Sequence, residues 1–121
     1  MKRELDLVTE FHKKFKVPVL DKPSLIPEDR LTHRHKLMKD EVEEYLKGAQ
    51  SGDLENVAKE LADILYAVYG TILEHGLQNI IGDVFGEVNR SNMSKDYHEY
   101  KMVKGQTYSP PDLKKFLGQK P

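Results

Sequence analysis

Two pairs of acidic side chains stand out in the middle of the chain, between residues 39 and 69. This stretch reads KDEVEEYLKGAQSGDLENVAKELADILYAVY, two helical patterns joined by a Gly/Ser turn. Each pattern carries two carboxylates three residues apart, Glu41 with Glu44 and Glu60 with Asp63. Residues at this spacing are neighbours on one helix face. Each helix is therefore expected to present a pair of oxygen ligands.

The second acid pair lies within an apolar run, ELADILYAVYG. Carboxylates in such surroundings cost folding free energy unless a positive group meets them, and a divalent cation is the simplest candidate. Ligand sets made only of oxygen select hard ions such as Mg²⁺ or Mn²⁺ and not zinc. A solvated acidic face is the alternative, and it is more common for a pair such as Glu41 and Glu44 in a charged helix.

The two pairs bear the same angular relation to the apolar faces of their helices. At about 100° per residue, the apolar stripe of the first helix centres about 80° from Glu41 and that of the second about 90° from Glu60. In an antiparallel hairpin, one hand turns both pairs toward each other and the other hand turns them apart. Four carboxylates in one cleft would repel, and bound cations or raised pKa values would relieve that repulsion.

Helical periodicity predicts an all-α, four-helix, bundle-like fold with no strand of useful length. A first helix is expected over residues 3–15, followed by a proline-rich extended connection. The second helix is expected to begin at Pro27 and to run to about residue 47, with Gly48 as the glycine that ends it.

The third helix is expected to begin after Asp53, as its N-cap, and to be closed by Gly76. The fourth is expected over residues 77–89. All 121 residues are expected to form one domain, a helical core over residues 1–95 and an irregular tail over 96–121 with one short helix after Pro111.

Composition excludes several kinds of site and partner. The chain has no cysteine, which removes disulfides, thiolate ligands and a cysteine nucleophile together. A net charge of −1 gives no basic field for a nucleic acid polymer. No apolar run reaches the ~18 residues of a membrane span. The charged N-terminus lacks a signal-peptide core, so a cytoplasmic location is expected. The small core of a chain this size favours oligomerisation.

At its acidic residues the chain resembles the all-α nucleotide pyrophosphohydrolases, the superfamily of MazG-like and phosphoribosyl-ATP pyrophosphohydrolases. Their pattern is EExxE on one helix and ExxD on the next, and here it reads DEVEE from Asp40 to Glu44 and ELAD from Glu60 to Asp63. Asp40 departs from the pattern, which has Glu at this position. The resemblance also covers Phe11, His12 and Phe15 and the segments ELADILYAVYGT, EVNRSNMSK and VKGQTYSPPDL. It implies a MazG-type fold.

This resemblance implies Mg²⁺-dependent hydrolysis between the α- and β-phosphates of a nucleotide, which releases a nucleoside monophosphate and pyrophosphate. It implies a metal site, for Mg²⁺ or Mn²⁺, whose ligands are Glu41, Glu44, Glu60 and Asp63. A metal ion lowers the pKa of an attacking water, and a nearby acid that does not bind the metal accepts its proton. Asp40 and Glu43 are the two candidates for this general base.

Polar residues near the end of the chain are candidates for binding the substrate. Asn89, Asn92 and Lys95, expected after the fourth helix, would contact base, sugar or phosphate, with a polar helix terminus as the alternative. Lys104 and Tyr108 would add phosphate contacts and base stacking if the tail folds over the site.

Histidines give weaker signals. His12 adjoins Phe11 and either packs in the core or contacts the substrate. His33 and His35 flank Arg34, and a solvated basic face is expected there because histidine is a poor ligand for a hard ion.

Three functions stay open. The first is a nucleoside triphosphate pyrophosphohydrolase acting on canonical or aberrant nucleotides, as in cleaning of the nucleotide pool. The second is the hydrolysis of phosphoribosyl-ATP in histidine biosynthesis. The third is a non-catalytic helical oligomerisation module. The resemblance implies a homodimer or homotetramer with a small-molecule nucleotide as its substrate, and no membrane or nucleic acid polymer is expected as a partner.

Overall fold

The computed structural model describes residues 1–98 and 101–118, and this part of the chain contains four α-helices and no strand beyond an isolated bridge between Asp96 and Val103. The helices are α1 (Lys2–Lys14), α2 (Glu28–Gln50), α3 (Leu54–Glu74) and α4 (Ile81–Met93). The prediction of an all-α fold is confirmed. None of these helices is long and apolar enough to cross a membrane.

Two compact units make up the chain, Met1–Gln78 and Asn79–Pro121. The first holds α1, α2 and α3, and α3 packs against both other helices. The second holds α4 and the residues that follow it. A single domain over residues 1–121 stays a prediction, and residues 99–100 and 119–121 of its tail lie outside the described part of the chain.

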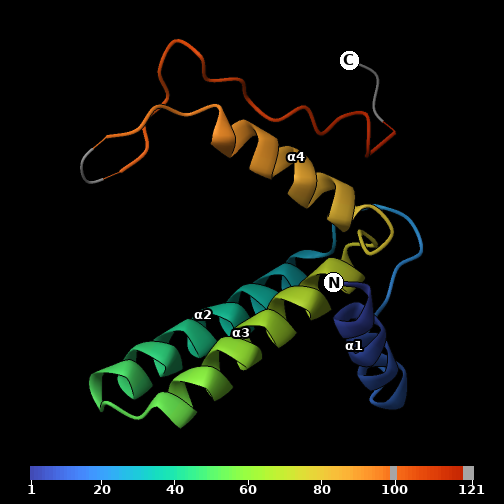
Figure 1. Ribbon diagram of the computed structural model, residues 1–121. Coiled ribbons are helices and arrows are strands. Elements are labelled where there is room, and N and C mark those ends of the chain that lie inside the picture. The colour runs from blue at the N-terminus through green and yellow to red at the C-terminus, as the bar shows by residue number, and fades with distance from the viewer. Residues whose placement is uncertain (99–100, 119–121) are drawn as a thin grey trace. The chain divides into compact units, whose positions relative to one another are not determined.

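The helices α2 and α3 lie side by side as an antiparallel hairpin (Figure 1). Gly48 does not end α2 as predicted but lies inside it, where an added Cβ would collide with the Asn56 side chain. The chain reverses at Gly52, whose φ of 75° is a conformation that glycine adopts without strain. Asp53 caps α3 as predicted, accepting a hydrogen bond from the Asn56 N–H at 3.2 Å.

An extended segment crosses the C-terminal end of α3. The Leu20 N–H donates to the Leu73 carbonyl at 3.0 Å, and the Ser24 N–H donates to the His75 carbonyl at 2.9 Å. These bonds satisfy carbonyl groups that a helix end leaves without partners. Gly76 follows α3 as predicted, with a φ of 67°, and an added Cβ there would collide with the carbonyl of Lys22.

A buried cluster of charges joins α2 to the C-terminal end of α3. The Glu74 side chain is 1% exposed and accepts hydrogen bonds from Arg30 at 2.9 and 2.8 Å. Arg34 lies 3.1 Å from the same carboxylate and also donates to the Thr71 hydroxyl at 3.1 Å and to the Ala67 carbonyl at 2.8 Å. Each buried charge therefore has partners, which such groups need.

The prediction of a solvated basic face is wrong for Arg34, which is buried. His33 and His35 are exposed, as predicted. Arg34 follows Leu31 by three residues and precedes Met38 by four, so it falls on the apolar stripe of α2. That position is the signal for its burial.

The fourth helix begins at Ile81 and not at residue 77, and it continues to Met93. Asn89 and Asn92 therefore lie within α4 and do not follow it as predicted. Tertiary contacts explain the extension, since Glu87 and Ser91 form a buried polar face on the last turns of this helix.

Residues 109–112 pack on that polar face. Glu87 accepts hydrogen bonds from Arg90 at 2.8 Å and from the Asp112 N–H at 3.2 Å. Arg90 donates to the Ser109 hydroxyl and the Pro110 carbonyl, each at 3.1 Å. The short helix expected after Pro111 is replaced by turns over residues 114–118, where Gly118 has a φ of 71°.

Substituting Glu74→Gln is expected to lower the free energy of unfolding by ~3–5 kcal/mol, because Arg34 would stay buried without its counter-charge. Urea unfolding followed by circular dichroism measures this. The matched control is Asp6→Asn, which removes an exposed pair with Lys2 at 2.8 Å and is expected to cost less than ~1 kcal/mol. Equal losses in the two variants would contradict the importance of the buried cluster.

Acid is expected to release residues 109–112 from α4. Arg90 and the Asp112 N–H lower the pKa of Glu87 from its ordinary value of 4.5 to about 2. A carboxylate with a lowered pKa stabilises the folded form above pH 4.5, and this stabilisation is lost as the pH falls toward 2. The amide resonances of Ser109 and Asp112 should therefore move between these two pH values. Glu87→Gln should abolish that transition, and an unchanged transition in the variant would assign it to another group.

Candidate metal and nucleotide site

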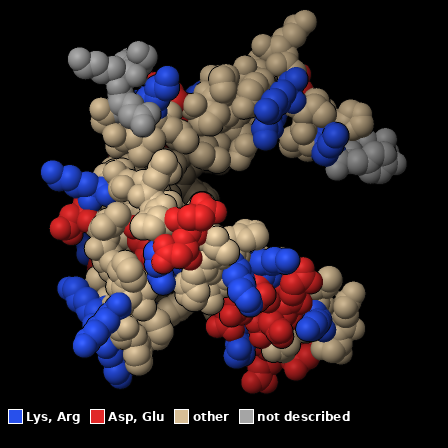
Figure 2. All heavy atoms as spheres, turned by 180° about the vertical axis from the view of Figure 1, so that it is seen from behind, with Lys and Arg blue, Asp and Glu red and all other residues tan. Residues whose placement is uncertain are grey.

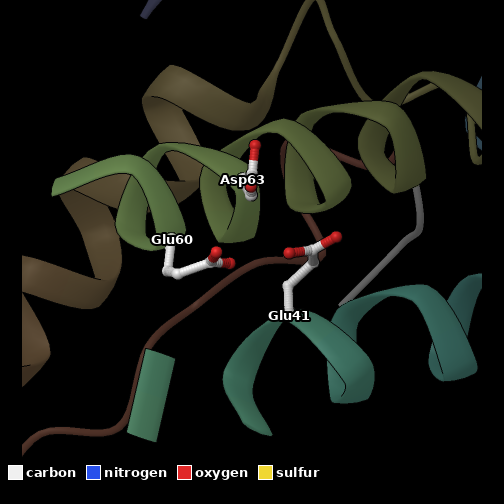
Figure 3. A group of neighbouring side chains, drawn as sticks. All are labelled: Glu41, Glu60 and Asp63. Atoms are coloured by element: carbon white, nitrogen blue, oxygen red, sulfur yellow. The ribbon is translucent and has the colours of Figure 1, made fainter. Parts of the chain in front are cut away.

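Three carboxylates from α2 and α3 converge in the first unit. Glu41, Glu60 and Asp63 each offer an oxygen atom, and these three atoms all lie within 4.8 Å of one another. Figure 3 shows the carboxylates of Glu41 and Glu60 turned toward each other between the two helices, with Asp63 one turn further along α3. The hairpin therefore has the hand that turns these acids toward each other.

The convergence is electrostatically unfavourable in the absence of a cation. Burial raises the pKa of Glu41, and the neighbouring Asp63 and Glu60 raise it further. Glu60 is 6% exposed, and its Oε2 atom is buried with no hydrogen-bond partner among the described residues. A buried acceptor without a partner carries a desolvation penalty. The donor set is entirely carboxylate oxygen, so these residues fit Mg²⁺ or Mn²⁺.

Glu44, the fourth predicted ligand, is not in this group. Its side chain is exposed on α2 and faces Lys47 at 3.8 Å. The two candidates for the general base also lie outside the group. Asp40 is paired with Lys36 at 2.6 Å, and the Lys36 ammonium lowers the pKa of Asp40. Glu43 is exposed to solvent. The structure thus brings three of the four predicted ligands together, and the roles of all these acids stay predictions.

A pocket of about 210 Å³ adjoins the acids. Glu41 and Asp63 contribute to its wall, together with Phe11, His12, Arg34, Leu37, Tyr66 and Ala67. The pocket therefore combines carboxylates with aromatic, cationic and imidazole groups. Of the six predicted substrate-binding residues, His12 is the one that lies beside the acid cluster in the first unit.

The environment of His12 favours its neutral form. The ring is buried, its Nδ1 lies 3.1 Å from the Pro18 carbonyl, and burial is the main cause that lowers its pKa, with Arg34 adding to the effect. A neutral ring that donates from Nδ1 keeps Nε2 as an acceptor. An added Cβ at Gly70 would collide with Arg34 and His12, so glycine leaves these two groups room.

The other predicted substrate-binding residues lie in the second unit. Asn89 and Asn92 are exposed on α4, and Lys95 follows that helix. The Lys104 ammonium lies 5.1 Å from the centre of the Tyr108 ring, a cation–π arrangement. Their contacts with a substrate stay predictions.

Sequence reasoning missed one further cation at the acid cluster. Lys59 Nζ lies 2.8 Å from Asp63 Oδ2 and 3.5 Å from Glu60 Oε1. Its position four residues before Asp63 is a spacing that pairs opposite charges on a helix, and this could have indicated the contact.

Residues 8–92 of the chain match the model of the family described as phosphoribosyl-ATP pyrophosphohydrolase. The matched range includes His12 and all three converging acids. No curated protein matches the chain.

Glu60→Gln is expected to weaken Mg²⁺ and Mn²⁺ binding more than about tenfold, since even groups that only orient metal ligands are worth about 10–100-fold. Without divalent ions the same variant should melt at a higher temperature than the wild type, because one of the mutually repelling carboxylates is gone. Calorimetry with Mn²⁺ and thermal melting with and without Mg²⁺ measure both effects. If the variant kept the wild-type response to Mg²⁺, Glu60 would not be a ligand.

Proposed function

Because the chain belongs to the phosphoribosyl-ATP pyrophosphohydrolase family, whose members hydrolyse phosphoric anhydrides, we propose that it is a Mg²⁺-dependent nucleoside triphosphate pyrophosphohydrolase. It cleaves between the α- and β-phosphates to give a nucleoside monophosphate and pyrophosphate. Its role would be to remove canonical or aberrant nucleotides from the nucleotide pool.

The observation that carries this proposal is the buried Oε2 atom of Glu60, which has no hydrogen-bond partner within residues 1–98 and 101–118 and lies beside the carboxylates of Glu41 and Asp63. When bound there, a divalent ion neutralises phosphate charge and lowers the pKa of an attacking water. Glu41, Glu60 and Asp63 would hold the ion, and Glu44 would join them from the next turn of α2.

The proton of the attacking water needs an acceptor that does not bind the metal. Lys36 already occupies an oxygen of Asp40 at 2.6 Å. This pair favours Glu43 over Asp40 as the general base. Comparing Asp40→Asn with Glu43→Gln separates the two roles.

The adjoining pocket supports a nucleotide as the substrate. His12 supplies an acceptor at its wall, and the rings of Phe11 and Tyr66 supply apolar surface. Arg34, whose guanidinium is held by Glu74, Thr71 and Ala67, adds a positive charge. An acceptor beside aromatic surface suits a heterocyclic base or a ribose. We propose that this pocket binds the base or ribose end of the substrate, away from the reacting phosphates. His12 would accept a hydrogen bond from that end.

A second candidate substrate is phosphoribosyl-ATP, which the description of the matched family favours. The same acids would serve this reaction, because the bond cleaved again joins the α- and β-phosphates. The third possibility, a non-catalytic oligomerisation module, leaves the buried Glu60 oxygen and the adjoining pocket without a role.

We also propose that the chain forms a homodimer or homotetramer through the faces of α1 and α3. Leu7, Leu61 and Leu65 are each about half exposed, at 49%, 46% and 51%. A second pocket there is lined mostly by apolar side chains, among them Leu7 and Leu65. Apolar surface gathered in one place usually marks an interface.

Pyrophosphate release from a panel of (d)NTPs and from phosphoribosyl-ATP, with and without Mg²⁺, tests the proposal. Glu60→Gln should reduce the rate about a hundredfold or more, because the metal supplies several kcal/mol of transition-state stabilisation. The matched control is Glu55→Gln, the same change at an exposed position of α3, and it should keep the wild-type rate.

Three outcomes of this assay are informative. Turnover of nucleoside triphosphates supports the proposed substrate. Turnover of phosphoribosyl-ATP alone would select the second candidate. Absence of turnover with every nucleotide, together with no effect of Mg²⁺ on melting, would overturn both enzymatic functions.

A further inference from the structure

Lys59 occupies a special position among the lysines of the first unit. Its ammonium group lies 2.8 Å from Asp63 Oδ2 and 3.5 Å from Glu60 Oε1, so it bridges two of the three converging acids. Figure 2 shows that acidic side chains gather over the α2–α3 hairpin with lysines among them. Lys36 and Lys47 each pair with one acid of their own helix, Asp40 and Glu44. Lys59 instead contacts the acid cluster itself.

We propose that Lys59 is an exchangeable counter-cation, which neutralises part of the acid cluster when no metal is bound and is displaced when a divalent ion binds. This inference rests on the proposed function, because it takes Glu60 and Asp63 as metal ligands. It adds a residue that sets the metal affinity of the site without touching the substrate.

Competition follows from the geometry. An ammonium group within hydrogen-bond distance of a carboxylate oxygen and a metal ion bound to that oxygen cannot occupy the same place. If the metal takes Asp63 Oδ2, it displaces Lys59. If it binds the other oxygen of Asp63, the ammonium group and the divalent ion repel each other across the same carboxylate. In both cases each cation weakens the binding of the other.

The side chain of Lys59 is suited to leave. It is 67% exposed, whereas that of Glu60 is 7% exposed, so the lysine can swing into water while the acid stays fixed. Lysine is a compact, strongly hydrated charge on a flexible stem, and arginine would hold a carboxylate with two bonds in a rigid fork. One ammonium also cannot satisfy the cluster, since Glu60 Oε2 has no hydrogen-bond partner in the part of the chain that the structure describes. The acid cluster therefore still favours the binding of a further cation while Lys59 contacts it.

The test compares Lys59→Met with the wild type by Mn²⁺ calorimetry and by thermal melting with and without saturating Mg²⁺. Removing the competitor should tighten Mn²⁺ binding about three- to tenfold, the scale of a modest coupling between two sites. Without metal, the variant should melt at a lower temperature, because the acids lose their counter-charge. With saturating Mg²⁺ the two proteins should melt together, because Lys59 no longer contacts the acids in either.

Lys36→Met is the matched control, since Lys36 pairs with Asp40 at the same four-residue spacing but Asp40 lies outside the cluster. It should change neither the Mn²⁺ affinity nor the response of melting to Mg²⁺. The control separates displacement from a general loss of positive charge near the acids. Lys59→Arg, which keeps a cation in place, should bind Mn²⁺ no more tightly than the wild type.

Two results would overturn the inference, and they are distinguishable. Lys59→Met could bind Mn²⁺ like the wild type, with a melting temperature lowered by the same amount with and without Mg²⁺. Lys59 would then form only an ordinary surface ion pair. The proposed function would then survive. If the wild type bound neither Mn²⁺ nor Mg²⁺, the metal site and the inference would fail together.

Discussion

The carboxylate of Glu74 lies at the junction of α2 and α3 and forms ion pairs with both Arg30 and Arg34. These contacts join residues that are 44 and 40 positions apart in the sequence, and they lie far from the hairpin turn. They therefore fix how α2 lies along α3. The acid cluster lies further along the same two helices. A shift of one helix against the other would separate Glu41 from Glu60 and Asp63. The buried ion cluster is thus a condition for the candidate metal site.

The candidate metal site itself lowers the stability of the fold. Three carboxylates meet in a partly buried place, and one oxygen of Glu60 has no partner among the described residues. Such local conflicts are expected where function needs them and are offset elsewhere. Here the offsets are Lys59, which meets two of the acids, and the ion cluster at the other end of the helices. A site arranged in this way gains most when a divalent cation binds.

The apolar stripes of the helices bury less than the sequence suggests. Leu61 and Leu65, two members of the stripe of α3, remain about half exposed, and Leu54 is 79% exposed. The periodicity identified the four helices but not the bounds of α4, because it depends only on the spacing of apolar residues. It could not show which part of the stripe is covered by other helices of the same chain. The proposed self-association would cover the apolar side chains that stay exposed.

Local sequence determined the helices, the Asp53 cap and the closure at Gly76, because each depends on residues within a few positions of one another. It also determined that Glu60 and Asp63 share a helix face. The tertiary structure decided the hand of the α2–α3 hairpin, and with it that Glu41 meets these acids while Glu44 stays exposed beside Lys47.

Long-range contacts decided the remaining features. Arg34 is buried because Glu74 meets it from another helix, α4 extends to Met93 because residues 109–112 cover its polar face, and Gly48 stays helical because Asn56 packs beside it. Spacing along one helix places a side chain on a face. Which group that face meets depends on the hand and register of the packing, and residues distant in the sequence set both.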